Sequence, residues 1–136
     1  MRGACLCGAV VLEVAGAHEA PSACHCTACR RWSGAAFWGF AVAPEALTVT
    51  GAVTSWRSSP FAERAWCPAC GTHLWFHDDG GPFELVPGLF PDMDGEALDR
   101  EVYADRAPAY ARLAGDHARI TKAEYEASHP HVEDAP

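Results

Sequence analysis

Short apolar and aromatic runs alternate with breaks that contain glycine and proline along most of the chain. Seven of these runs have the β-branched and aromatic content, and the flanking turn formers, that are typical of strands. They cover residues 9–14, 36–42, 47–51, 54–58, 63–67, 73–77 and 83–88. The pattern predicts a mainly β protein built from short strands.

Three segments depart from this strand pattern. Residues 26–34, "CTACRRWSG", predict a helical turn, and residues 107–115, "APAYARLAG", have helical character. Residues 121–128 predict a further helix, because Thr121 can cap its first turn ahead of Glu124. The sequence therefore adds a short helical segment at the C-terminal end of a β protein.

The chain has 136 residues, a length that suits one domain with a core of its own. No linker separates two domains, and no motif repeats along the chain. We therefore predict a single domain, in which residues 1–115 form the β body and residues 116–136 form a C-terminal helix and tail. Residues 129–136 are polar and contain prolines, so we expect this end to fray.

Composition and charge limit the partners. The formal net charge is −8, whereas binding to a phosphate backbone needs a basic surface, so we expect no nucleic-acid partner.

The N-terminal apolar run is interrupted by Glu13, and cleavage of a signal peptide there would remove Cys5 and Cys7. The uncharged apolar run at residues 33–44 is too short to span a bilayer. We expect a cytoplasmic protein with no membrane partner.

The cysteines are the residues most indicative of function. There are seven: Cys5, Cys7, Cys24, Cys26, Cys29, Cys67 and Cys70. An odd number without an export signal argues against a disulfide framework, and their close spacing indicates bound metal. An iron–sulfur cluster is an alternative, although the Cys-x-Cys spacing fits ferredoxin patterns poorly.

Two cysteine pairs suit a closed structural site. "CPACG" at residues 67–71 has the form of a zinc knuckle, in which the glycine permits the tight turn. In an extended segment residues i and i+2 point to the same face, so Cys5 and Cys7 can both reach one ion. Together the two pairs would supply four thiolates and close a long loop of the chain.

Three thiols remain: those of Cys24, Cys26 and Cys29. By the same alternation Cys24 and Cys26 share a face, and His25 points to the other. Cys29 returns to the ion if the chain turns helically after Cys26. Three protein ligands with one open position are the layout of a catalytic zinc. Alternatively, His73, His77 or another side chain closes this site and makes it structural too.

In this order, "GACLCGAV", "CHCTACRRWSGA" and "WCPACGTHLWF" resemble the motifs of the glutathione-dependent formaldehyde-activating enzyme family, which also contains centromere protein V. The similarity runs from Gly3 to about Phe76. It implies a β-tent fold of short antiparallel sheets stapled by two zinc ions, within residues 1–115. It also implies a carbon–sulfur lyase that forms or cleaves a thiol–aldehyde adduct such as S-hydroxymethylglutathione, from the small molecules glutathione and formaldehyde.

The resemblance implies a role for each cysteine. The structural zinc would be held by Cys5, Cys7, Cys67 and Cys70, and the catalytic zinc by Cys24, Cys26 and Cys29. Because glutathione carries carboxylates, Arg30 or Arg31 is a candidate to bind one of them, the alternative being a solvated surface pair. His25 either exchanges a proton near the metal or is a hydrogen-bonded structural histidine. The alternative function is a non-catalytic zinc-binding module that binds a partner protein.

Overall fold

The computed structural model describes residues 1–129 and divides into two compact units. The first unit consists of Met1–Ala20 and Gly39–Glu96. The second consists of Pro21–Trp38 and the described chain from Ala97 onward. Apart from His129, the predicted frayed end lies outside the described residues, and the single-domain organisation stays a prediction.

Strands dominate the described chain. They are β1 (Arg2–Ala4), β2 (Val11–Val14), β3 (Ser22–Cys24), β4 (Phe37–Val42), β5 (Leu47–Thr50), β6 (Thr54–Ser59), β7 (Ala62–Trp66), β8 (His73–Asp78), β9 (Phe83–Leu85), β10 (Arg100–Val102) and β11 (Ala118–Ile120). The α-helices are α1 (Thr27–Ser33) and α2 (Lys122–Ser128). The 3-10 helices are η1 (Pro44–Ala46), η2 (Pro87–Leu89), η3 (Pro91–Met93), η4 (Ala104–Arg106) and η5 (Ala109–Ala111). Each of the seven predicted runs overlaps a strand, so the mainly β class is confirmed.

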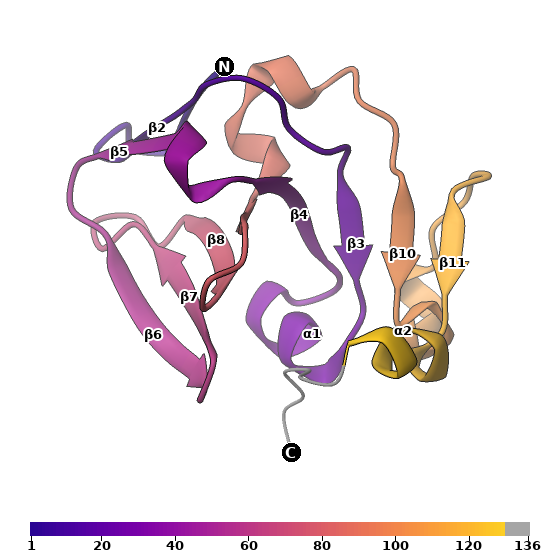
Figure 1. The fold of residues 1–136 in the computed structure, drawn as a ribbon. Coiled ribbons are helices and arrows are strands. Elements are labelled where there is room, and N and C mark those ends of the chain that lie inside the picture. The colour runs from indigo at the N-terminus through magenta and orange to yellow at the C-terminus, as the bar shows by residue number, and fades with distance from the viewer. Residues whose placement is uncertain (130–136) are drawn as a thin grey trace. The chain divides into compact units, whose positions relative to one another are not determined.

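The first unit is built from antiparallel strands. β2 lies between β1 and β5 in a three-stranded sheet. In a second set of strands, neighbours pair in the order β4-β9-β8-β7-β6. In Figure 1 the long strands β6, β7 and β8 follow one another in the chain and lie side by side. The core of this unit includes Phe40, Phe90, Leu12, Leu74 and Leu85, all with no exposed surface. Burial of these side chains supplies the main driving force for folding this unit.

The second unit contains three parallel strands. β10 pairs with β3 on one side and with β11 on the other, and Figure 1 shows the three arrows pointing the same way. Val102 is the register partner of both Cys24 and Ile120. The sequence pattern did not predict these strands, because a three-residue strand shows too little alternation to be recognised. The parallel pairing is a further difference from the antiparallel sheets that the family resemblance implies.

The helices agree with the sequence pattern at two places and differ at a third. α1 begins after Cys26 as predicted, and α2 begins after Thr121 with a complete capping box to Glu124. The helix expected over residues 107–115 is reduced to the short η5. Proline has no N–H to continue a helical ladder, and Pro108 stands immediately before η5. Each α-helix has seven residues, and in the described chain neither reaches the length of a membrane-crossing helix.

Gly51 brings the end of β5 against the N-terminal segment. Its φ is +103°, and a Cβ atom there would lie 2.1 Å from the carbonyl oxygen of Ala9. Replacement by alanine would therefore combine backbone strain with a clash that only a backbone shift relieves. We expect Gly51→Ala to lower the free energy of unfolding by about 3 kcal/mol, measured by urea denaturation.

Gly16 provides the matched control for this substitution. Its φ is also positive, +79°, but no atom lies within 4 Å of the added Cβ. Gly16→Ala should therefore cost only the strain of the left-handed conformation, about 1 kcal/mol. Equal losses in the two variants would contradict the close approach at Gly51.

Candidate metal centres

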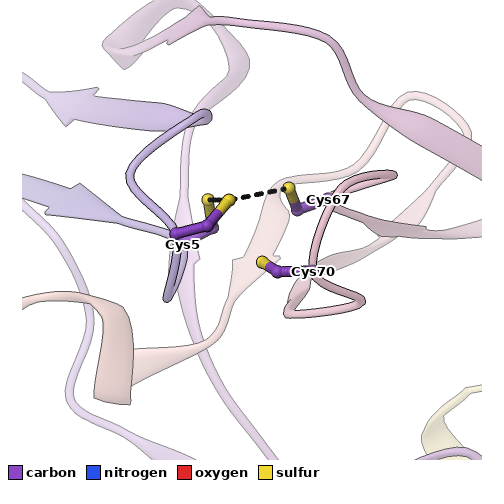
Figure 2. A group of neighbouring side chains, drawn as sticks. Cys5, Cys67 and Cys70 are labelled. Carbon is purple, nitrogen blue, oxygen red and sulfur yellow. Dashed lines mark hydrogen bonds between the residues drawn. The ribbon is translucent and has the colours of Figure 1, made fainter.

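The first unit brings together the four cysteines predicted to form one site. Each of their sulfur atoms lies within 4.8 Å of the others, in the group Cys5, Cys7, Cys67 and Cys70. Figure 2 shows the side chains of Cys5, Cys67 and Cys70 converging from the turn after β1 and the turn between β7 and β8. The Sγ–Sγ distance is 3.5 Å from Cys5 to Cys7 and 3.8 Å from Cys7 to Cys67. Tetrahedral coordination with Zn–S bonds of about 2.3 Å places sulfurs about 3.8 Å apart, so the donor set fits such an ion.

Each of the two turns that carry these cysteines is closed by a backbone hydrogen bond from a glycine, three residues after Cys5 and four residues after Cys67. The N–H of Gly8 donates to the carbonyl of Cys5, and the N–H of Gly71 donates to the carbonyl of Cys67, both at 2.9 Å. Both glycines have φ near +75°, at +75° and +73°, which few other residues adopt without strain. Thr72 connects the turns, because its Oγ1 accepts from the N–H of Leu6 at 3.2 Å. The local sequence thus forms each turn, and Thr72 holds one against the other.

The protonation of these thiols depends on their neighbours. Hydrogen bonds from the side chain and the backbone of Thr72 lower the pKa of Cys70 to about 6. The N–H of Ala9 favours the thiolate of Cys7, but the nearby thiols of Cys70 and Cys5 raise its pKa to about 11. Like charges this close cannot all ionise by themselves. A divalent cation would favour deprotonation of the whole set.

The second unit brings together the other three cysteines. Cys24 ends β3, Cys26 caps α1, and Cys29 lies in the first turn of α1. Their sulfur atoms lie within 4.8 Å of one another, and among the described residues these three form the whole cluster. His73 and His77, the alternative closing ligands, are in β8 of the first unit and are not members of it. The arrangement offers a metal ion three thiolates.

The electrostatics of the three-cysteine cluster also suit a cation. The neighbouring thiols of Cys26 and Cys29, together with burial, hold the pKa of Cys24 well above its ordinary value. Cys26 and Cys29 are themselves buried. Without a cation the cluster therefore resists multiple ionisation, whereas the positive charge of a bound divalent ion would stabilise the three thiolates. The donor chemistry fits a soft ion such as zinc.

The three predicted substrate residues lie in different surroundings. His25 is fully buried, and its Nε2 lies 2.8 Å from Oε2 of Glu101. Arg30 and Arg31 occupy the last turn of α1, where positive charge also interacts favourably with the helix dipole. Arg31 is exposed, whereas the Nε of Arg30 is buried and has no hydrogen-bond partner among the described residues. Their roles in substrate binding stay predictions.

Sequence reasoning missed a buried polar network beside the three-cysteine cluster. Glu101 on β10 contacts His25, which is 76 positions away, as well as His117 and Arg119. Burial favours the neutral acid, but hydrogen bonds from His117 and His25 hold the pKa of Glu101 below its ordinary value. Residues this far apart carry no local spacing signal, so no motif could have indicated the network.

Known proteins resemble this chain in sequence and in fold. A family model described as "Glutathione-dependent formaldehyde-activating enzyme" matches residues 1–104. A Schizosaccharomyces pombe protein named an uncharacterized lyase is 33% identical over 110 residues, covering 79% of this chain and 80% of that protein. A Halomonas elongata protein named a putative glutathione-dependent formaldehyde-activating enzyme is 33% identical over 107 residues, covering 71% of this chain and 67% of that protein. A crystal structure of a Rhodobacter sphaeroides protein shares the fold, with a TM-score of 0.53 and 24% identity, over 70% of this chain and 92% of that one.

Proposed function

This chain belongs to the glutathione-dependent formaldehyde-activating enzyme family, and on that premise we propose that it is a zinc-dependent carbon–sulfur lyase. Its substrates would be a small thiol and an aldehyde, with glutathione and formaldehyde as the first pair to test. The observation that supports the proposal is the contrast between the two clusters. One offers four thiols, a closed set, and the other offers three, which leaves one tetrahedral position for a substrate.

The two clusters would then have different roles. Cys5, Cys7, Cys67 and Cys70 would hold a structural zinc that links the two turns of the first unit. Cys24, Cys26 and Cys29 would hold the catalytic zinc. When bound there, zinc would supply a Lewis acid that keeps a substrate thiol deprotonated, whereas a free thiol with a pKa of about 8.5 is mostly protonated at neutral pH.

The chain's own residues would bind and orient the thiol. Arg30 lies one turn along α1 from Cys26, since its N–H donates to the carbonyl of that residue at 3.0 Å. Its buried Nε has no partner among the described residues, so a carboxylate of the thiol substrate would complete its hydrogen bonding. The exposed Arg31 would contribute long-range attraction to the same negative charge.

The proposed reaction balances without a further reactant. The thiol sulfur bonds to the carbonyl carbon of the aldehyde, and the carbonyl double bond becomes a single bond to a hydroxyl oxygen. The proton of the thiol ends on that oxygen. The reverse reaction breaks the carbon–sulfur bond and returns the free thiol and the aldehyde. The contribution of the protein would be proximity and activation of the thiol.

Freshly purified, reduced protein should carry two zinc ions per chain and should form S-hydroxymethylglutathione faster than the uncatalysed mixture. Elemental analysis for zinc and iron gives the metal content, and nuclear magnetic resonance of the product gives the rate. A thiol without carboxylates, 2-mercaptoethanol, is the matched control and should react more slowly in the presence of the protein, because it cannot pair with Arg30.

The other outcomes are equally informative. Two zinc ions per chain with no acceleration for either thiol would favour the non-catalytic zinc module. Iron in place of zinc, or protein without metal, would contradict the assignment of both clusters.

A further inference from the structure

The buried carboxylate of Glu101 is the centre of the polar network in the second unit. Glu101 is 2% exposed, and burial of a carboxylate is unfavourable unless it is paired and hydrogen-bonded. Its Oε2 accepts from Nε2 of His25 at 2.8 Å, and its Oε1 accepts from Nε2 of His117. The Nε of Arg119 lies 3.4 Å from the same Oε1. The carboxylate is thus held from both sides of β10.

His25 occupies the position between two cysteines of the three-cysteine cluster. Its backbone N–H donates to the carbonyl of Val102 at 3.0 Å, and its side chain is bound to Glu101. Both attachments are to β10. The Nδ1 of His25 has no partner among the described residues, so the bond to Glu101 is the polar contact that fixes this fully buried ring. Fixing His25 also fixes the chain between Cys24 and Cys26.

The strand register places Glu101 on the face of the sheet opposite to Cys24. Glu101 pairs with Ala23 and Arg119 across the parallel strands, whereas Val102 pairs with Cys24. Paired residues in a sheet share a face and successive residues alternate, so Glu101 and Cys24 lie on opposite faces. The carboxylate therefore positions the cluster indirectly, through its hydrogen bond with His25 on the opposite face of the sheet from Cys24.

The two residues that contact Oε1 of Glu101, His117 and Arg119, come from the C-terminal part of the chain. His117 precedes β11 and Arg119 lies within it, whereas the matching family model ends at residue 104. The guanidinium of Arg119 is itself held, because its NH2 group donates to the carbonyls of Leu113 and Gly115, both at 3.1 Å. The segment beyond the family match thus supplies two of the groups that hold Glu101 in place.

We propose that Glu101 is a positioning residue for the three-cysteine cluster, anchored by His117 and Arg119, and that it raises the metal affinity of that cluster through His25. This inference rests on the proposed metal binding at Cys24, Cys26 and Cys29. Partners that orient a ligand from outside its coordination shell typically change metal affinity by about 10–100-fold. The four-cysteine cluster lies in the other unit and has no link to Glu101 among the hydrogen bonds described above, so its affinity should not change.

The test uses the full chain and cobalt(II), because its thiolate charge-transfer absorption reports binding to cysteine. Apo-protein of the wild type and of Glu101→Gln is titrated with cobalt in competition with a chelator, well below the unfolding temperature. We expect the affinity of the three-cysteine cluster to fall by about 10–100-fold in Glu101→Gln, with that of the four-cysteine cluster unchanged. Glu126→Gln is the matched control, because Glu126 is in the same unit and accepts from the hydroxyl of Tyr103 at 2.9 Å, not from His25.

A second variant covers the case in which Glu101→Gln fails to fold. His117→Gln leaves the bond between His25 and Glu101 in place and removes one anchor of the carboxylate, so we expect a loss at the lower end of the range, about 10-fold. Equal losses at both clusters would indicate general destabilisation and overturn the inference, as would unchanged affinity in the folded variants. If the wild type binds a single cobalt ion, the proposed catalytic metal site fails and the inference fails with it. Two cobalt ions per chain with unaltered affinities would overturn the inference alone.

Discussion

A Cys26→Ser variant should stay folded and carry one metal ion per chain instead of two. Its activity should fall by more than about 100-fold, because the loss of a metal ligand costs more than the loss of a residue that only orients a ligand. Cys26 is both a member of the three-cysteine cluster and the N-cap of α1, where its Sγ accepts from the N–H of Cys29 at 3.4 Å. Serine is a preferred N-cap, so the hydroxyl can keep the cap. A hydroxyl does not ionise at neutral pH as a coordinated thiol does, so the metal site loses a ligand.

Activity, metal content and circular dichroism are measured on the same preparation of this variant. Cys26→Ala is the control that separates the two roles, because it removes the cap as well and should cost about 1 kcal/mol more in stability. Activity in Cys26→Ser equal to that of the wild type would contradict a catalytic role for the cluster and favour the partner-binding module.

The second large effect is expected on stability, at the four-cysteine cluster. Cys67 has no exposed surface and lies in the core of the first unit, 3.8 Å from Cys7 across 60 positions of sequence. A metal ion that joins these residues restricts the unfolded chain as a cross-link does. For a loop of this length the cross-link contributes about 4 kcal/mol. We therefore expect Cys67→Ser to lower the free energy of unfolding by about 4 kcal/mol or more.

Urea denaturation followed by tryptophan fluorescence measures this change, and the zinc content of the variant confirms the loss of the ion. Cys26→Ser provides the matched comparison, because it makes the same substitution at the other cluster and should cost less than about 1 kcal/mol. A strong chelator should destabilise the wild type by a similar amount to Cys67→Ser. A stability within 1 kcal/mol of the wild type for Cys67→Ser would contradict a structural role for this cluster.

The sequence predicts the longer strands and the capped helix well because their signals are local. β8 shows aromatic and apolar residues bounded by turn formers, and α2 shows a capping threonine three residues before a glutamate. β1, β3, β10 and β11 have three residues each, and nothing in their composition distinguishes them from loops. Their strand character comes from pairing with distant segments, which no window of sequence contains.

Short-range geometry sets the individual cysteine pairs, but spacing alone does not assign them uniquely to two clusters. That assignment is what the family resemblance implies, and the structure brings the same two groups of cysteines together. Cys5 and Cys7 share a face by alternation, and Cys67 and Cys70 share a turn, so each pair is set by residues that are neighbours in the chain. The buried contact of Glu101 with His25 depends instead on which strands pair and in what register. That choice is made by the free energy of the whole fold, since it balances burial and hydrogen bonding over segments separated by dozens of residues. Only the tertiary structure therefore brings the carboxylate of Glu101 to His25, between two cysteines of the three-cysteine cluster.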